Sequence, residues 1–252
     1  YMIFTRKLLW TQHDISEPEK EKQHQLFEFH SHMETNNMTE QEYLDELIER
    51  YPCLAPMKEQ IGHAYEILKE AYESGHKLLI AGNGGSAADS EHIAGELMKG
   101  FRKKRTMSKE MSETFWKVDL EAGEELSEKL QGALPAIALC GHPGLSTAFL
   151  NDVDGQLIFA QQVYGYGNEG DVLLAISTSG NSANIYYACV TAKAKGMKVI
   201  GLTGRDGGKL KHISDETLIV PESETFKIQE LHLPIYHALC LMLETHFFQE
   251  EN

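Results

Sequence analysis

Five short apolar segments, each bounded by glycine or polar residues, constrain the fold of this chain more than any other feature. They are KLLIAG at 77–82, AIALCG at 136–141, VLLAIS at 172–177, KVIGLTG at 198–204 and ETLIV at 216–220. Short continuous apolar runs are typical of strands that are buried on both faces, as in parallel sheets. Helical patterns separate most of these runs. The sequence therefore predicts an α/β fold, a three-layer sandwich around a five-stranded, mainly parallel sheet.

Helices are predicted at both ends of this alternating region. Between residues 38 and 74, apolar residues recur at helical spacing. This spacing predicts two helices that break near Pro52 and Pro56 and end at Gly75. The stretch 225–249 predicts one long terminal helix with a continuous apolar side.

The rest of the chain suggests a simple domain organisation. Residues 1–37 are polar and poorly periodic, so we expect a mobile leader. The charged stretch at 102–134 fits no strand, and we interpret it as a mainly helical insertion. The prediction is a single domain over residues 38–252 that carries this insertion.

Charge and composition exclude several classes of protein. The net charge of −15 over 252 residues argues against a nucleic-acid surface, which draws on clustered Lys and Arg. The one basic run, at 102–105, is interpreted as a solvated loop. No segment approaches the roughly 20 apolar residues of a membrane span. The four cysteines form no CxxC pair, which favours free thiols in the cytoplasm, with Cys140 and Cys189 in the core.

Two loops have the composition of a phosphate site. GNGGSAAD at 82–89 and STSGNSAN at 177–184 each follow a predicted strand and open a helix. Glycines let backbone N–H groups approach an anion, and a helix N-terminus presents unpaired donors. Because ligands of open α/β sheets collect outside the carboxyl ends of the strands, the two loops are expected to act together. The alternative is that both are ordinary strand-to-helix turns with good caps.

Two pairs of polar residues occur at helical spacing. His92 and Glu96 are four residues apart on the helix that the first loop opens, and Gln229 and His237 are eight apart on the terminal helix. The first spacing suits two metal ligands or an acid–base pair, although a surface His–Glu pair has the same spacing. His237 alone also fits a buried core histidine, which is how we interpret His232.

Four motifs, in order and spacing, resemble one family. GNGGSAADSEHIAGEL, ISTSGNSAN, GMKVIGLTGRDGG and IQELHLPIYHAL resemble the sugar isomerase (SIS) domain proteins of the phosphoheptose isomerase group. The similarity covers residues from about 40 to 249. It implies a cytoplasmic homotetramer that interconverts an aldose and a ketose phosphate, typically sedoheptulose 7-phosphate and a manno-heptose 7-phosphate.

The resemblance also implies roles for particular residues. Glu96 and His237 match the proton-transfer pair, and His92, Glu96, Gln229 and His237 match positions that bind zinc in some members. Because Gln is an unusual zinc ligand, we expect variable occupancy. The substrate-binding and phosphate-binding positions, besides Gln229, are Asn83, Gly84, Gly85, Ser86, Asn151, Asp152, Ser177, Thr178, Ser179 and Ser182.

The implied chemistry is consistent with these residue types. Moving a carbonyl between neighbouring carbons requires a base, an acid and a group that stabilises the developing oxyanion of an enediol. A carboxylate and an imidazole can fill the first two roles, and zinc can act as the Lewis acid.

Two other functions stay open. The first is a non-catalytic SIS protein that senses a sugar phosphate or binds a protein partner, as replication-initiator-associating relatives do. The second is an isomerase of another phosphosugar, because the insertion, the run ELMKGFRKKR and the pair Phe226-Lys227 depart from the family pattern near the sugar end of the pocket. Retention of all four metal-ligand positions favours an enzyme.

Overall fold

The structure is a computed structural model that describes residues 38–248, so the interpretation of residues 1–37 as a leader lies outside the described part. All five predicted strands form one sheet in the order β2-β1-β3-β4-β5, and every pairing is parallel. The strands are β1 (Leu78–Gly82), β2 (Ala136–Ala138), β3 (Val172–Ser177), β4 (Lys198–Thr203) and β5 (Glu216–Ile219). Strand β2 is three residues shorter than predicted, because Leu139–Gly141 turn into a 3₁₀ helix, η2.

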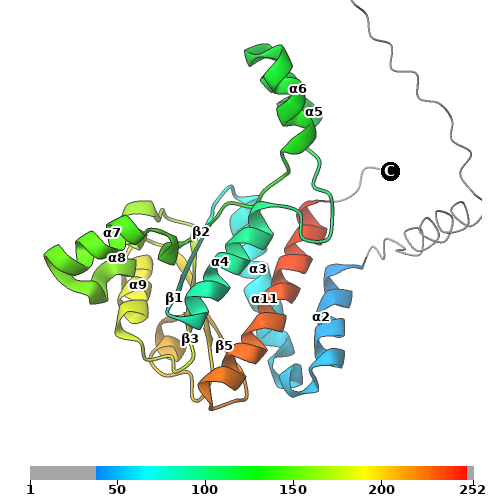
Figure 1. Cartoon of the computed structure of the whole chain (residues 1–252). Coiled ribbons are helices and arrows are strands. Elements are labelled where there is room, and N and C mark those ends of the chain that lie inside the picture. The colour runs from blue at the N-terminus through cyan, green and yellow to red at the C-terminus, as the bar shows by residue number, and fades with distance from the viewer. Residues whose placement is uncertain (1–37, 249–252) are drawn as a thin grey trace, which may run out of the picture. The chain divides into compact units, whose positions relative to one another are not determined.

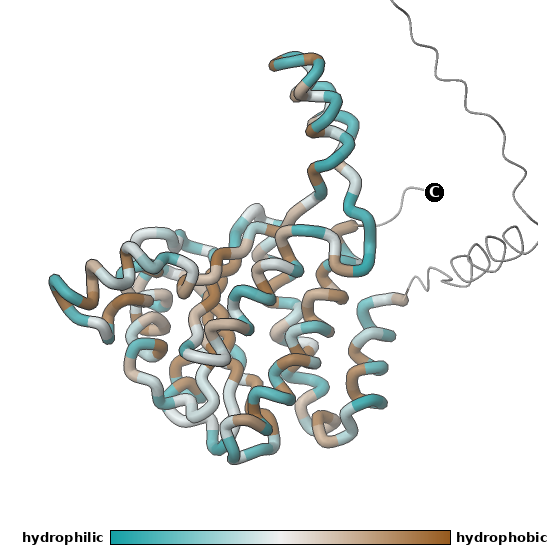
Figure 2. Tube along the Cα trace, in the orientation of Figure 1, coloured by the Kyte–Doolittle hydropathy of each residue, from teal (hydrophilic) through white to brown (hydrophobic). Residues whose placement is uncertain are grey.

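Helices cover both faces of this sheet, which confirms the three-layer prediction (Figure 1). On one face lie α2 (Glu40–Arg50), α3 (Lys58–Glu73), α4 (Gly85–Met98) and α11 (Thr225–Phe247). On the other lie α8 (Ile158–Tyr166), α9 (Ala183–Ala194) and α10 (Leu210–Ile213). Alternate strand residues enter the two cores: Leu78 and Ile80 one, Leu79 and Ala81 the other. Figure 2 shows the resulting concentration of apolar residues along the strands.

The remaining elements connect these layers. A 3₁₀ helix, η1 (Pro52–Met57), separates α2 from α3, where the two prolines predicted a break. Between β2 and α8 the chain forms α7 (Pro143–Phe149), a wide helical turn η3 (Leu150–Asp154) and η4 (Gly155–Leu157). None of the helices among residues 38–248 has the length and apolar character needed to cross a membrane.

The predicted insertion contains two helices, α5 (Lys109–Val118) and α6 (Leu120–Lys129). They pack against each other as a hairpin that stands away from the sheet and its helices (Figure 1). Gly123 lets them approach closely, since a Cβ there would lie 2.7 Å from the carbonyl oxygen of Phe115. The helical interpretation of this stretch is therefore confirmed for residues 109–129.

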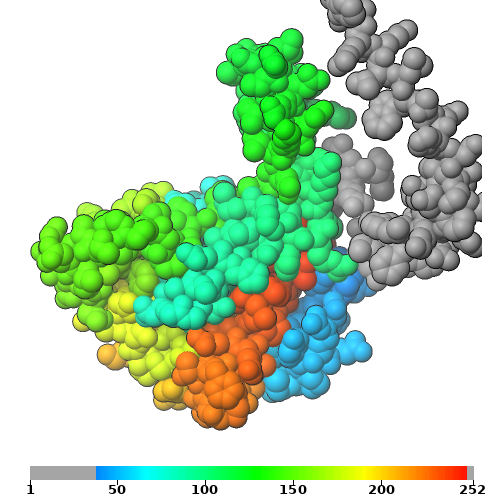
Figure 3. Space-filling view, viewed as in Figure 1, coloured from blue at the N-terminus to red at the C-terminus, as the bar shows by residue number. Residues whose placement is uncertain are grey.

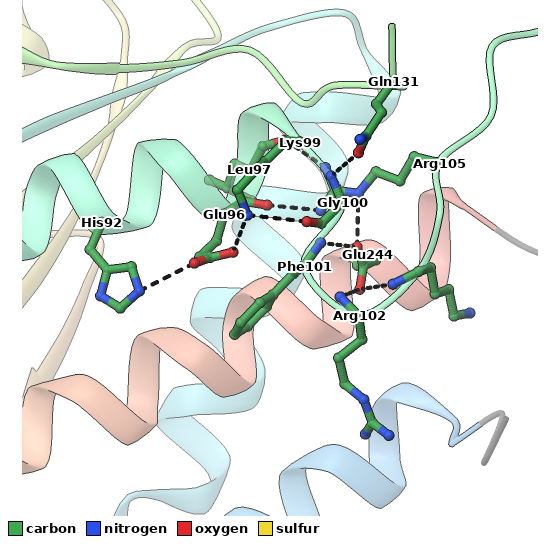
Figure 4. A network of polar contacts seen from close by, with 11 residues as sticks. His92, Glu96, Leu97, Lys99, Gly100, Phe101, Arg102, Arg105, Gln131 and Glu244 are labelled. Atoms are coloured by element: carbon green, nitrogen blue, oxygen red, sulfur yellow. Dashed lines mark hydrogen bonds and ion pairs between the residues drawn. The ribbon is translucent and has the colours of Figure 1, made fainter. Parts of the chain in front are cut away.

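A buried ion pair joins the end of α4 to α11 and corrects the interpretation of residues 102–105 as a solvated loop (Figure 4). Arg105 is only 1% exposed, and its Nε lies 2.9 Å from Oε1 of Glu244. Its other two nitrogens donate to the carbonyl oxygens of Leu97 and Glu96, at 2.6 and 2.9 Å. Because these carbonyls end α4 without helical partners, Arg105 caps the helix. Glu244 also accepts hydrogen bonds from three backbone N–H groups, those of residues 101 to 103.

His232 lies in the core, as predicted, fully buried with its Nε2 3.3 Å from the carbonyl oxygen of Thr203. Burial lowers the pKa of His232 to about 4, and the hydrogen bond opposes this shift only in part. The folded protein therefore holds a neutral imidazole at a pH where an exposed histidine is charged.

We expect Glu244→Ala to lower the free energy of unfolding by about 3–5 kcal/mol, because Arg105 would remain buried without a counter-charge. Equilibrium unfolding in urea measures this loss. As a control, Glu125→Ala removes the exposed surface pair with Lys129 and should change stability by less than about 1 kcal/mol. Replacing both partners, Arg105→Met with Glu244→Leu, should recover part of the loss. Equal effects of the Glu244 and Glu125 variants would contradict this assignment.

Acidification should destabilise the protein through His232. The unfolded chain binds this proton with an ordinary pKa near 6.5 and the folded chain with a pKa of about 4, so unfolding takes up a proton between these values. The stability due to His232 is complete above pH 7 and falls by about 2 kcal/mol at pH 5. His232→Leu should remove that part of the pH dependence in urea titrations at pH 7.5 and 5. The Thr203 carbonyl would keep its bond from the Val220 N–H. An unchanged pH dependence would show that His232 is not the group responsible.

Candidate active site

The two glycine- and serine-rich loops lie side by side at the carboxyl edge of the sheet. Strands β1 and β3 are neighbours, with Gly82 opposite Ile176, so the loops that follow them leave the same edge together. A mutual amide pair joins the loops: Asn83 donates to Asn184 at 3.0 Å, and Asn184 donates back at 2.8 Å. The structure thus places the two loops next to each other and joins them. Their role in binding a phosphate stays a prediction.

Glycine is required at the start of the first loop. Gly84 has a φ of 56°, a left-handed conformation that favours glycine. Gly85 begins α4, and a Cβ there would lie 2.5 Å from the side-chain nitrogen of Gln229. The side chain of Gln229 therefore packs against the N-terminus of α4. Next along α4, Ser86 is buried, whereas Asn83 and the two glycines are exposed.

The serine-rich loop holds its hydroxyl groups close together. The Oγ atoms of Ser177 and Ser182 lie 3.0 Å apart, and Ser179 accepts a hydrogen bond from the backbone of Asn181. Thr178 and Ser182 are partly exposed, so the loop offers hydroxyl donors toward solvent at the start of α9. Gly180 has a φ of 65°, and a Cβ there would lie 2.0 Å from the carbonyl oxygen of Gly207. The serine-rich loop therefore packs closely against the segment that follows β4.

The predicted acid–base residues lie on α4 and α11, which pack against each other beside α2 (Figure 3). Nε2 of His92 is 3.2 Å from Oε1 of Glu96, as the i, i+4 spacing predicted (Figure 4). The rings of His92 and His237 are perpendicular with centroids 5.0 Å apart. The structure therefore brings both histidines and Glu96 together from segments more than 140 residues apart.

His237 sits in a partly buried environment. Burial lowers its pKa, with a further contribution from His92, while Glu96 opposes the shift. Its Nε2 is buried and has no hydrogen-bond partner, and Phe101 covers the ring at a centroid distance of 5.4 Å. A neutral imidazole with a free ring nitrogen can accept or deliver a proton.

The four predicted zinc ligands are only partly assembled. His92, Glu96 and His237 supply nitrogen and oxygen donors of the kind zinc takes, and the unpaired Nε2 of His237 fits such a role. Gln229 lies instead at Gly85, nearly two turns of α4 before His92. Within residues 38–248, no three His, Cys, Asp or Glu side chains are arranged so that they could hold a metal ion.

Asn151 and Asp152 are not joined by hydrogen bonds to the other predicted site residues. Both are exposed in η3, and Asn151 donates to Asp152 at 2.8 Å. No hydrogen bond of the described residues joins them to either loop or to the two histidines. Their predicted contact with substrate stays a prediction.

Sequence reasoning missed three residues of the site: Asn184, Tyr236 and Asp89. Asn184 pairs with Asn83, and the hydroxyl of Tyr236 contacts both Asp89 and His92. Asn184 stands at the end of the quoted STSGNSAN motif, which could have pointed to it. Tyr236 lies in an apolar helix and has the pattern of a core residue.

Comparisons with known proteins support the resemblance to the SIS domain family. The SIS domain family matches residues 42–132 and 121–204 of this chain. The chain is 39% identical over 206 residues to a phosphoheptose isomerase of Nitratiruptor sp., which covers 80% of this chain and 96% of the relative. It is 42% identical over 193 residues to a phosphoheptose isomerase of Clostridium acetobutylicum, with coverage of 77% and 85%.

Solved structures agree with these relatives. A phosphoheptose isomerase from Francisella tularensis matches with a TM-score of 0.64 and 33% identity over 80% of this chain and 94% of that chain. One from Neisseria gonorrhoeae matches with a TM-score of 0.62 and 34% identity, over 79% and 94%. The motifs, the fold and these similarities lead to one conclusion: the chain belongs to the phosphoheptose isomerase group of the SIS domain family.

Proposed function

We propose that this protein interconverts a ketose phosphate and an aldose phosphate, with sedoheptulose 7-phosphate and a manno-heptose 7-phosphate as the substrate pair. The observation that carries this proposal is the meeting of His237 with the His92–Glu96 pair on facing helices, one of which begins at a loop suited to phosphate. The likeness to phosphoheptose isomerases supports the choice of a heptose.

Glu96 and His237 would carry the proton between the two carbons. One takes a proton from the hydroxyl-bearing carbon beside the carbonyl while the other gives a proton to the carbonyl oxygen, so that an enediol forms. The first proton then returns to the former carbonyl carbon as the hydroxyl on the neighbouring carbon gives up its proton, which completes the new carbonyl. The neutral form of His237 that burial favours can accept a proton, and Glu96 has carboxylate lone pairs left to do the same. The hydroxyl and N–H groups of the two loops would hold the phosphate at the start of α4 and α9.

Zinc is proposed as a cofactor of this site. His92, Glu96 and His237 would hold it only after their side chains rearranged, since the structure does not arrange them as a metal site, and Gln229 would join them only if its side chain left Gly85. When bound, zinc would supply Lewis acidity toward the sugar oxygens. The proton transfer proposed above is assigned to the protein side chains alone.

A homotetramer in the cytoplasm is proposed from the family resemblance. One feature of the site supports an assembly: the side chain of His92 is 42% exposed in the single chain. Enediol chemistry is protected when water is excluded, and a neighbouring copy of the chain could provide that cover.

A phosphosugar-binding protein without catalysis is the second candidate. It would need the two joined loops but not an unpaired imidazole beside a carboxylate, so the unpaired Nε2 of His237 favours the enzyme. An isomerase of a different phosphosugar would share all of these features.

Glu96→Gln and His237→Ala should each reduce kcat by at least about a hundredfold, because each removes one member of the proton-transfer pair. The measurement is isomerisation of sedoheptulose 7-phosphate by the purified protein, with and without added zinc. His63→Ala, on α3, is the control and should retain full activity. No turnover by the parent, with the phosphosugar still raising the melting temperature, would support binding without catalysis or another substrate. Turnover that survives both substitutions would reject the assigned pair.

Ser182→Ala should raise KM by about tenfold with a smaller change in kcat, because a hydroxyl directed at the phosphate acts in both the ground state and the transition state. Steady-state kinetics with the same substrate measures both constants. The matched control is Ser127→Ala on α6, where the hydroxyl only donates to the carbonyl of Gly123. An unchanged KM in the Ser182 variant would remove this loop from the phosphate site.

A further inference from the structure

The hairpin of α5 and α6 buries almost none of its own side chains. Within these two helices only Gly123 is buried, and each helix has 10 residues. Isolated helices shorter than about 12 residues are marginal in water, because most helical stability in proteins comes from packing against other elements. A hairpin of this size therefore needs a further surface that covers it.

Exposed apolar side chains run along the hairpin to its tip, the turn between α5 and α6. Val118 and Leu120 flank this turn and are 84% and 73% exposed, the two highest values for large hydrophobic side chains within residues 38–248. Figure 2 shows apolar positions spread among hydrophilic ones along the hairpin. Large apolar side chains that gather on one exposed element mark an interaction surface. Four more such side chains lie on the helices or at their end: Met111, Trp116, Leu126 and Leu130.

A hollow at the base of the hairpin offers a matching apolar surface. Its volume is about 860 Å³, and its lining includes Met107, Met111 and Phe247. Lys104 and Lys109 also line it, and both are exposed. The base of the hairpin thus combines apolar side chains with positive charge.

The two ends of the hairpin carry opposite charges. Around the tip, residues 117–125 include four acidic side chains and one lysine. At the base, residues 102–109 include four basic side chains besides the buried Arg105, and no acidic one. Two hairpins side by side in opposite directions would bring each acidic tip to a basic base, whereas a parallel pair would place like charges together.

We propose that the hairpin is a self-association element, in which the hairpins of two copies of this chain pair in opposite directions. Each tip, with Val118 and Leu120, enters the hollow at the base of the other hairpin, and the four helices form a bundle. The hairpin stands away from the sheet and its helices, so its sides are open to a second copy (Figure 1). A different protein would have no need of charges that complement each other within one hairpin. This pairing requires no catalytic activity, so it stands independently of the proposed function.

Reversing the charge of the tip should weaken this pairing. In Glu121→Lys with Glu124→Lys, two exposed residues of α6 would repel the basic base of the partner, and two-fold symmetry makes each contact occur twice. We expect the dissociation constant to rise about tenfold or more and the protein to shift to a smaller assembly. Adding Lys104→Glu and Lys109→Glu exchanges the charges of the two ends and should restore the association of the parent. The measurement is the mass of the full-length protein by sedimentation equilibrium over a wide range of protein concentration.

An apolar variant and a matched control complete the test. Val118→Ser with Leu120→Ser should weaken the association at high salt as well, because apolar contacts are not screened by ions. Glu59→Lys with Glu70→Lys reverses two exposed charges on α3 and should leave the association unchanged.

Two results would overturn the proposal. A parent that stays monomeric, or that has the same dissociation constant as both hairpin variants, would leave this surface to a different protein. Association that the tip reversal weakens and the charge exchange does not restore would reject the pairing of each tip with the base of a second copy.

Discussion

The packing of α4 along α11 is the constraint on which the candidate site depends. Three contacts hold these helices in register: Gln229 against Gly85, Tyr236 against Asp89 and His92, and Glu244 against the residues that follow α4. The partners are separated by about 144 residues in each case, so the two helices run in the same direction. A shift of either helix by one turn would separate all three contacts at once.

This register explains why some features were predictable and others were not. The strands were visible because parallel strands buried on both faces need continuous apolar runs, and the two loops because glycine and serine follow those runs directly. Contacts between residues of α4 and residues of α11 produce no recognisable pattern in the sequence around either partner. Arg105 shows this most clearly: in the sequence it ends a basic run that resembles a solvated loop, whereas the structure buries it against Glu244.

Tyr236 and His232 show a second limit of sequence reasoning. Both lie on the same apolar helix, and periodicity gives them the same interpretation as core residues. His232 is in the core and has a backbone carbonyl as its partner. Tyr236 is equally buried, yet its hydroxyl reaches the edge of the site. The apolar body of tyrosine determines its burial and its hydroxyl determines its partners, and only the first of these is visible as a periodic pattern.

Two glutamates lie where α4 and α11 pack together, Glu96 on α4 and Glu244 on α11, and they differ in the hydrogen bonds that they accept. Glu244 is 1% exposed and accepts four bonds, from Arg105 and three backbone N–H groups, which occupies both oxygens fully. Glu96 is 13% exposed at its side chain and has one histidine and one exposed lysine as partners. A carboxylate whose lone pairs all accept from fixed donors ties the surrounding backbone and side chains together. Glu96 retains unpaired capacity and faces an imidazole. The donors around each carboxylate therefore favour a structural role for Glu244 and are consistent with the proton-transfer role proposed for Glu96.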